Sequence, residues 1–468
     1  MADRALVGID LGIAWAHTVR VIDQAGETIA KRKCWPAVDS LGEVERCALG
    51  GAEEGTRLEV IMAPTGPAWL PIAVFFASRG HAVFRVSSAT ASDLRKFFSR
   101  HTKTNGIDAE TLARIGIVER AGLIELSLPD AARATLDRRV RAGDRLTAQA
   151  AEHKVRIKDL VRQVLPMSPL TGDLGAADLA VLERYGDPNL LVKAGPKRLA
   201  TLIAKASQGH LGAERADQWI AAAEASLEGY AGHPAVAFAD LAAEIATEIR
   251  LLRAITAELA VHATARETAY KAVDPDELAR SLPGVADIGG PAIVATMGEP
   301  ERFRRGKQFR SFSGLVPKAS ETANTDRKGQ PMSKAGSSLL RTTLVRAADT
   351  ARKQDPQLAR IYYLQMVERG KDHLGALCVV AANLSERAWT VMRRGEPYVI
   401  RDTDGHPVTP AEAKAIIDEQ WTVPADVRAR RRSKKAGKAP SNVLPGRSRP
   451  QSGQRGDLLL TPSSTLAS

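Results

Sequence analysis

The chain has 468 residues, a net charge of +12 at pH 7 and a sequence pI of about 9.7. This length is enough for two or three domains with cores of their own. A net positive charge of this size favours a polyanionic partner, either nucleic acid or an acidic membrane surface. It can also simply keep the protein soluble. The three cysteines have neither paired spacing nor histidine partners, which argues against a disulfide framework and a structural zinc site.

The sequence contains no targeting or membrane-spanning pattern. Its N-terminus lacks the apolar core of a signal peptide. No apolar run approaches the length of about 18 residues that a membrane span requires. The basic C-terminal tail has no large apolar anchors that would hold it on a membrane surface. We therefore expect a cytoplasmic protein with no membrane partner.

Residues 1–125 alternate between strand and helix patterns. We expect strands at 5–10, 17–22, 28–33, 58–62 and 82–86, and helices at 69–78, 91–100 and 107–115. Three antiparallel strands followed by alternating helix and strand are typical of a ribonuclease-H-like α/β domain. The first region is therefore predicted to have this fold.

The rest of the chain is predicted to be mainly helical. Residues 126–275 form a helical, coiled-coil region, and residues 276–395 form a second compact, mainly α domain. Near the end of residues 126–275, apolar residues recur at spacings of three and four and form a stripe along one helix. Such a stripe suits an internal helix core and a dimer interface equally. Residues 400–468 read as a basic, disordered tail that either touches nucleic acid or is merely solvated. The stripe consists of Leu241, Ile245, Ile249, Leu252, Ile255 and Leu259.

Three oxygen-bearing side chains in the first region are candidate metal ligands. Asp10 ends the first predicted strand between Gly8 and Gly12, where a carboxylate can hold Mg²⁺ beside a phosphate. Asn105 and Asp108 are three residues apart at the start of a predicted helix and therefore share one face. Each also has a structural reading, since Asp10 suits a strand-end turn and Asn105 suits a loop or helix cap.

The glycines around Asp10 are also found in sugar kinases. A sugar-kinase-like ATPase would need a second phosphate-binding glycine loop and a later adenosine motif. The sequence contains neither of these. The kinase reading therefore explains only residues 8–12.

The third region begins with a candidate phosphate-binding turn. Residues 282–290 resemble a helix-hairpin-helix, whose tight turn at Gly284 and Gly289 presents backbone N–H groups to phosphate without reading bases. A bare structural turn is the alternative. The cations that follow directly favour phosphate binding, and they are Arg302, Arg304, Arg305, Lys307 and Arg310.

A hydroxyl-rich loop follows these cations. A hydroxyl flanked by cations is a candidate nucleophile for phosphoryl transfer, although hydroxyls are common in loops. Lys334 and Arg341 add further positive charge beside this loop and are candidate nucleic-acid contacts. The candidate hydroxyls are those of Ser320, Thr322 and Ser333.

The most specific pattern in the chain comprises 314–317 (GLVP), 332–336 (MSKAG) and 339–341 (LLR). With the preceding features in the same order, the chain resembles the insertion-sequence transposases of the 110/116/902 type, also called DEDD transposases. The resemblance covers about residues 5–125 and 276–395. It implies a RuvC-like N-terminal domain, a coiled-coil linker and a C-terminal transposase domain.

The resemblance also implies an activity and partners. Such proteins are RNA-guided DNA recombinases that use Mg²⁺ and a structured guide RNA, which pairs with both donor and target double-stranded DNA. The family implies dimers that join into a tetramer. It implies a bacterial protein that acts at the nucleoid.

The family's site residues carry over incompletely. Its four acidic positions fall in order on Asp10, Ala63, Asn105 and Asp108, so two carboxylates are intact. Its nucleophilic serine falls on Thr322, with Ser320 as the nearby alternative.

Glu59 cannot replace the missing glutamate at Ala63 without a register change. The two residues share a predicted strand face, but Glu59 lies about 13 Å away along the strand. Two hypotheses follow: a working recombinase with Thr322 as nucleophile, or a degenerate copy that binds nucleic acid and cleaves poorly.

Overall fold

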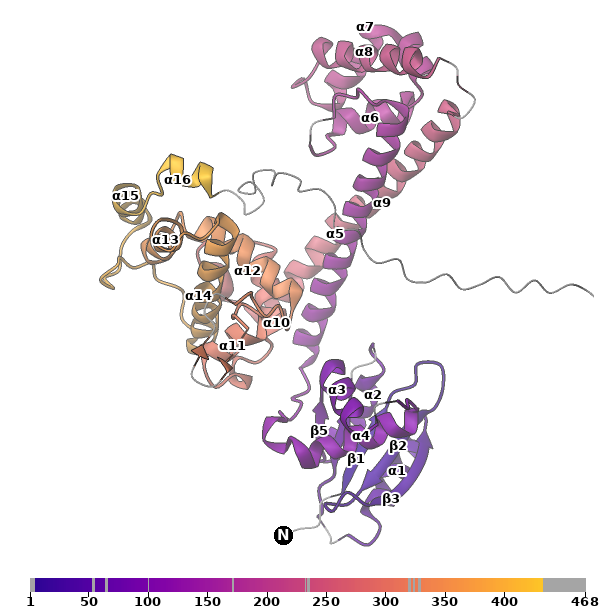
Figure 1. Ribbon diagram of the computed structural model, residues 1–468, viewed down its shortest axis with the longest axis vertical. Coiled ribbons are helices and arrows are strands. Elements are labelled where there is room, and N and C mark those ends of the chain that lie inside the picture. The colour runs from indigo at the N-terminus through magenta and orange to yellow at the C-terminus, as the bar shows by residue number, and fades with distance from the viewer. Residues whose placement is uncertain are drawn as a thin grey trace, which may run out of the picture. The chain divides into compact units, whose positions relative to one another are not determined.

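The computed structural model describes residues 5–52, 55–63, 66–99, 101–170, 172–231, 233, 236–318, 321–322, 325–326 and 330–431. The chain divides into two compact units, Met1–Asp130 and Ala131–Ser468 (Figure 1). The first is a mixed α/β unit and the second is almost entirely helical. The predicted α/β character of the N-terminal region and the helical character of the remainder are confirmed.

The first unit is built on a five-stranded sheet of order β3-β2-β1-β4-β5. β1 pairs antiparallel with β2, which pairs antiparallel with β3, while β4 and β5 run parallel to β1. The carboxyl ends of β1, β3, β4 and β5 therefore meet at one edge. The strands are β1 (Leu6–Asp10), β2 (His17–Ile22), β3 (Thr28–Cys34), β4 (Glu59–Met62) and β5 (Ala82–Arg85).

Helices cover both faces of this sheet. One face packs against α1 (Val38–Leu49) and α2 (Trp69–Ser78), because alternate strand residues such as Val7 and Ile9 are apolar on that side. The other face carries α3 (Ser88–Phe98) and α4 (Asn105–Val118), followed by the short 3-10 helix η1 (Arg120–Gly122). The helix α1 fills a stretch where the sequence predicted no element.

The helix α4 lies unusually close to β1. A Cβ atom on Gly8 would lie 2.0 Å from the carbonyl oxygen of Ala109, and one on Gly116 would lie 2.7 Å from Leu6. Residue 109 faces residue 8 and residue 116 faces residue 6, so α4 runs opposite to β1. The start of α4 therefore lies at the carboxyl end of β1.

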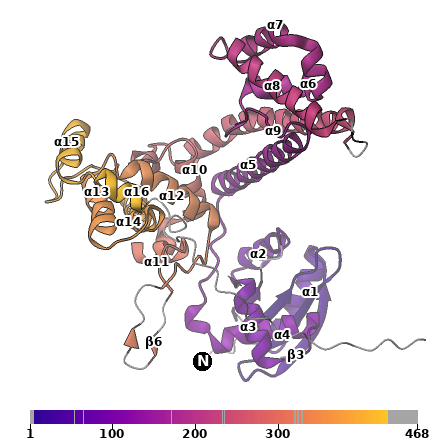
Figure 2. The ribbon, with the colours of Figure 1, turned by 45° about the horizontal axis from the view of Figure 1, so that its top comes forward.

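The second unit begins with a long antiparallel helical hairpin of α5 (Ala131–Val164) and α9 (Phe238–Val273), which lie side by side in Figures 1 and 2. A helical head packs against one end of it through Ile157, Val161, Ile245 and Ile249. The predicted apolar stripe is therefore used within the chain, where Ile245, Ile249 and Leu252 are buried. The head consists of α6 (Ala176–Tyr185), α7 (Pro188–Ala206) and α8 (Ala213–Tyr230).

The C-terminal helices of this unit share a separate apolar core, in which Phe309, Leu340, Leu344, Val380 and Leu384 are fully or almost fully buried. Two short strands, β6 (Glu321–Thr322) and β7 (Thr325–Asp326), lie between its helices in the sequence. The remaining elements are η2 (Leu278–Ser281), α10 (Gly289–Met297), η3 (Pro300–Arg302), α11 (Gly306–Phe312), α12 (Ser338–Ala351), α13 (Pro356–Tyr363), the π-helical turn η4 (Leu364–Glu368) and α14 (His373–Arg394).

Part of the predicted disordered tail is folded, so that prediction is wrong for residues 400–431. These residues form α15 (Pro410–Gln420) and α16 (Ala425–Arg430). A capping box between Thr409 and Glu412 starts α15, and Ile417 and Val427 are buried. Residues 400–431 hold five Lys and Arg against six Asp and Glu, so the basic run that suggested disorder begins only at their end. Residues 432–468, with most of the cationic run, lie outside the described residues.

The described part of the chain has no helix that is both long and apolar enough to cross a membrane.

Candidate active site

Two carboxylates meet at the carboxyl end of β1. Asp10 is the last residue of β1, and Asp108 lies in the first turn of α4, whose start faces that end of the strand. Burial raises the pKa of Asp10, and the negative charge of Asp108 raises it further, while Lys103 acts in the opposite direction. The two carboxylates are therefore close enough to repel each other.

Asn105 starts the same helix. The helix cap is its neighbour Thr104, whose hydroxyl accepts a hydrogen bond from the N–H of Ile107 at 3.2 Å. The Asn105 side chain is exposed and lies three residues from Asp108, on the same helix face. Its amide oxygen is thus available at the edge that carries the two carboxylates.

Ala63 occupies the position beside Asp10. β4 pairs in parallel with β1, with Met62 opposite Ile9. The next residue of each strand is Ala63 and Asp10, so the two lie about one strand spacing, roughly 5 Å, apart. Ala63 packs against the apolar cluster under α4, so it points to the face that carries Asp10. A longer side chain at position 63 would reach the carboxylates, but a methyl group supplies no ligand.

Glu59 lies at the opposite end of β4, opposite Leu6 of β1. It is buried and forms an ion pair with Arg120 at 3.0 Å. The register of β4 and this ion pair both hold Glu59 away from Asp10. It is therefore a structural charge pair and no substitute for the absent glutamate.

Asp108 forms an ion pair that the sequence did not predict. Arg95, in the last turn of α3, forms an ion pair with Asp108 at 3.3 Å, and both side chains are partly buried. The contact depends on how α3 packs against α4, and the twelve residues between Arg95 and Asp108 give no periodic signal for it. Arg95 neutralises part of the charge that Asp108 would offer to a metal ion.

The side chains at this edge fit a divalent metal ion with few protein ligands. Among the described residues, no group of three or more His, Cys, Asp and Glu side chains is placed to hold a metal. Mg²⁺, however, is commonly held by one or two carboxylates, with water and substrate phosphates completing its coordination. Asp10 and Asp108 supply two such carboxylates, and the amide oxygen of Asn105 is a third hard ligand.

His17 holds the loop that follows Asp10. Its Nδ1 atom accepts a hydrogen bond from the N–H of Gly12 at 3.1 Å, so neutral His17 carries its proton on Nε2. The ring is buried, and Nε2 has no hydrogen-bond partner among the described residues. Burial lowers the pKa of His17. Protonation of Nδ1 would break the bond to Gly12.

We therefore expect the chain to lose stability as the pH falls below about 6.5, the ordinary pKa of histidine. The unfolded chain then takes up a proton that folded His17 resists, so the stabilisation is present above this pH and lost below it. Urea unfolding at about pH 5 and about pH 7.5 measures this difference. The variant His17→Asn keeps an acceptor without titrating and should show a smaller difference. An equal difference in both proteins would contradict the prediction.

The most specific sequence pattern has a packing explanation in the second unit. Gly314 and Gly336 both have positive φ angles of 72° and 93°. A Cβ on Gly314 would lie 2.2 Å from the carbonyl oxygen of Ala335, and one on Gly336 would lie 2.0 Å from that of Phe312. The Arg341 guanidinium donates to the carbonyl oxygens of Ser313 and Lys334 at 3.3 and 3.2 Å. Arg341 therefore braces the two ends of the intervening segment.

Thr322 lies in this braced segment. Backbone hydrogen bonds from Lys318 to Pro331 and from Ser333 to Val316 pair the two arms of the segment near its base. Thr322 in β6 pairs with Thr325 in β7, and β6 stands apart from the helices in Figure 2. Ser320, the alternative nucleophile, lies outside the described residues. Thr322 is thus carried on a hairpin arm.

The predicted basic residues differ in what they contact. Arg302 stacks on Phe303 and Phe312, and Arg310 forms an ion pair with Glu386 at 2.7 Å. Both side chains therefore have partners within the fold. Three more cations around α11 are exposed, as is Lys334 near the hairpin base, and these are Arg304, Arg305 and Lys307.

The helix-hairpin-helix resemblance is only partial. The element before the turn is the 3-10 helix η2, not an α-helix. The N–H of Gly284 donates to the side chain of Gln354 at 2.9 Å, and a Cβ on Gly284 would lie 2.2 Å from the carbonyl oxygen of Ala347 in α12. Gly284 is thus required for packing, and its amide already has a partner. Gly289 starts α10 and is partly exposed.

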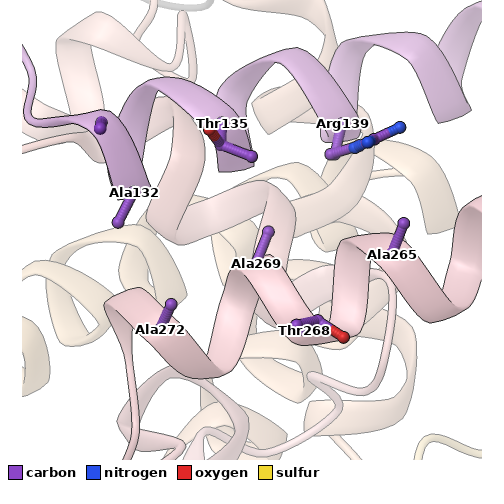
Figure 3. Close-up of a pocket in the computed structure, with 8 residues that line it drawn as sticks. Ala132, Thr135, Arg139, Ala265, Thr268, Ala269 and Ala272 are labelled. Carbon is purple, nitrogen blue, oxygen red and sulfur yellow. The ribbon is translucent and has the colours of Figure 1, made fainter.

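A shallow groove also lies between the start of α5 and the end of α9 (Figure 3). It is lined by small side chains, among them Ala132, Ala265 and Ala269, with Arg139 at its edge. It holds none of the predicted site residues. We assign it no chemistry.

Two family models match the chain at the regions just described. The Transposase IS116/IS110/IS902 family model matches residues 276–363, and the DEDD transposase model matches residues 7–166. Together they span more than half of the chain. The chain belongs to the IS116/IS110/IS902 transposase family.

Relatives of nearly full length support this membership. The chain is 24% identical over 412 residues to the 43.6 kDa protein of insertion element IS110 from Streptomyces coelicolor, which covers 86% of this chain and 98% of that protein. It is 24% identical over 396 residues to the 44.8 kDa protein of insertion element IS116 from Streptomyces clavuligerus, covering 84% and 95%. A probable family 20 transposase from Pseudomonas aeruginosa is 33% identical over 125 residues, covering 25% and 35%.

Family membership makes the chain a transposase of an insertion sequence that acts on DNA. DEDD transposases use divalent metal ions. The match that begins at residue 7 includes β1 and α4, which carry Asp10 and Asp108.

Proposed function

We propose that this transposase cleaves and exchanges DNA strands with a Mg²⁺ site at Asp10, Asp108 and Asn105 and with Thr322 as nucleophile. The observation that carries the proposal is geometric: Asp10 ends β1, and Asp108 lies in the first turn of α4, whose start packs at that end of the strand. Burial raises the pKa of Asp10, and the charge of Asp108 adds to this effect. When bound, Mg²⁺ would supply charge neutralisation and orientation at a scissile phosphate. We also propose that the first unit has the ribonuclease-H-like, or RuvC-like, fold.

The chain's own residues would then divide the work. Asp10 and Asp108 would bind the metal in their ionised forms, and Asn105 would complete the site with a neutral oxygen. The Thr322 hydroxyl would attack phosphorus and lose its proton, while the bond to the leaving deoxyribose oxygen breaks and that oxygen takes up a proton. A threonyl phosphodiester and a free strand end result. Arg341 would act indirectly, because it braces the arm that carries Thr322.

A second candidate function is nucleic-acid binding with impaired cleavage. Two features favour it. Ala63 stands where a carboxylate would lie beside Asp10, and Arg95 already neutralises part of Asp108. Both features lower the affinity of the site for a divalent cation.

The substitution Ala63→Glu distinguishes the two candidates. If the copy is impaired, the added carboxylate should raise strand cleavage and exchange by about 10-fold or more, since even outer partners of a metal site are worth about 10- to 100-fold. An in vitro recombination assay with Mg²⁺ measures the effect. Ala63→Gln is the matched control, because it has a similar size without the charge. Equal activity of the wild type and Ala63→Glu would show that this carboxylate is not needed.

We further propose that the protein binds a structured guide RNA and double-stranded donor and target DNA. The net charge and the exposed cations Arg304, Arg305, Lys307 and Lys334 support this. Sequencing of RNA that co-purifies with the protein tests the guide. Absence of RNA from the flanks of its own gene would contradict it.

Assembly into dimers and tetramers is likewise a proposal. The first four residues of the α9 stripe, from Leu241 to Leu252, do not support it, because they pack within the chain. Light scattering of the protein with and without nucleic acid tests the assembly.

A further inference from the structure

The three tryptophans of the first unit all lie at the carboxyl edge of the sheet. Trp15 is in the loop after β1, Trp35 directly follows β3, and Trp69 starts α2 after β4. Trp69 is partly buried, and the guanidinium of Arg85 stacks on it at 4.4 Å. Trp15 and Trp35, in contrast, are 80% and 53% exposed. Two exposed tryptophans at the edge that carries the candidate active site form a candidate binding surface, because a ligand that covers them would bury apolar area.

The backbone holds both exposed tryptophans in place. The bond from Gly12 to His17 closes the β1–β2 loop, and a Cβ on Gly12 would lie 2.4 Å from the carbonyl oxygen of Trp15. The N–H of Trp35 donates to the hydroxyl of Ser40 at 3.0 Å. The two rings are therefore presented by anchored backbone, which lowers the entropy lost when a ligand binds them.

Two exposed lysines lie on the same face of the sheet as Asp10. Asp10 pairs with Thr18 of β2, which pairs with Lys33 of β3, so these residues form one row across the sheet. Gly8, Arg20 and Lys31 form the next row. The helix α4 packs on β1, β2 and β4, whereas Lys31 and Lys33 on the edge strand are exposed. Both lysines belong to the sheet face that carries Asp10, and the backbone of Lys33 lies two strand spacings, about 10 Å, from that of Asp10.

We propose that Trp15, Trp35, Lys31 and Lys33, the tryptophan surface, bind an unpaired DNA strand that leads to the Asp10–Asp108 site. Aromatic rings that stack bases, next to cations that contact phosphates, are the combination that binds single strands. A duplex keeps its bases stacked on one another and cannot offer them to the rings. This inference rests on the proposed function for the choice of DNA, but it concerns binding and does not require cleavage.

Binding of a fluorescein-labelled single-stranded DNA, followed by anisotropy without divalent metal, tests the rings. We expect Trp15→Ala and Trp35→Ala each to weaken binding by about 5- to 100-fold, the effect of one lost stacking interaction. Trp15→Phe should retain most of the affinity. The control is Ile124→Ala, which removes a side chain that is 73% exposed next to Glu125, whose partner Arg57 precedes β4 at the opposite edge. It should leave binding unchanged.

Salt dependence tests the lysines separately. Lys33→Gln should reduce the slope of log affinity against log salt concentration by about 0.7, the value for one lost phosphate contact on a single strand. The control Arg46→Gln lies on α1, on the opposite face of the sheet, and should not change the slope. An unchanged slope in Lys33→Gln would overturn the assignment of this lysine.

Three results would overturn the proposal. Unchanged single-strand affinity in Trp15→Ala is the first. The second is that single-stranded RNA binds more tightly than single-stranded DNA and that Trp15→Ala loses this RNA binding. This result would assign the surface to RNA. A change in oligomeric mass with unchanged DNA binding is the third, because it would assign the surface to another protein copy. Thermal unfolding of each variant shows whether the fold persists. If the wild type binds single strands through this surface but never recombines DNA, only the proposed function fails.

Discussion

The variant Asp10→Asn is expected to lose DNA strand cleavage by more than about 100-fold, since loss of even an outer partner of a metal site costs about 10- to 100-fold. The substitution keeps the shape of the side chain and removes its charge. Asp10 and Asp108 are the two intact carboxylates of the site, so the variant leaves one charge, and Arg95 already pairs with that one. Divalent-metal affinity and cleavage should fall together.

This loss should occur without unfolding. Burial and the charge of Asp108 raise the pKa of Asp10, so its ionised form is unfavourable in the folded chain. Asp10→Asn should therefore keep or increase the stability. Calorimetric titration with Mg²⁺ and unfolding by urea measure the two quantities. Asp39→Asn on the exposed side of α1 is the matched control. If the wild type proves inactive in cleavage, the effect of Asp10→Asn on cleavage is measured in the Ala63→Glu variant. Full metal affinity in Asp10→Asn would contradict the assignment.

The variant Gly8→Ala is expected to destabilise the first unit by about 3 kcal/mol, at the upper end of what overpacking usually costs. The added Cβ would lie 2.0 Å from the Ala109 carbonyl oxygen and 2.5 Å from the Ala113 nitrogen. Both atoms belong to the backbone of α4, so the whole helix must move. Because α4 also carries Asp108, the same shift would separate the two carboxylates.

Hydrogen exchange of the backbone amides of β1 and α4, in the full chain, measures the stability of the first unit. Gly42→Ala in α1 is the matched control, because no described residue comes within 4 Å of its added Cβ. Alanine is a better helix former than glycine, so this control should be stabilised by up to about 1 kcal/mol. Equal protection in Gly8→Ala and the wild type would show that α4 does not pack as closely as described.

Much of the first unit was predictable because its strands are short, apolar and separated by turns. The strand His17–Ile22 and the helix Trp69–Ser78 have the predicted bounds. Asp10 stood out because a carboxylate ends a buried strand between two glycines. The helix Val38–Leu49 was missed, since its polar residues and Gly42 weaken the periodic signal.

Other features depended on contacts between distant segments. The ion pair of Arg95 with Asp108 needs α3 to fold against α4, and the partner of Glu59 is Arg120, 61 residues later. The role of Arg341 as a brace, rather than a nucleic-acid contact alone, follows from two carbonyl oxygens that packing brings to it. Neither periodicity nor charge could indicate such partners.

The sequence by itself determined the family, the alternating character of the first region and the loss of a carboxylate at Ala63, because motifs and strand periods are local properties of the chain. Only the tertiary structure decided that Ala63 lies beside Asp10, that the α9 stripe is an internal core, and that Trp15 and Lys33 share an edge with the carboxylates. Strand register and helix packing bring these residues together, and both are set by burial across many residues at once.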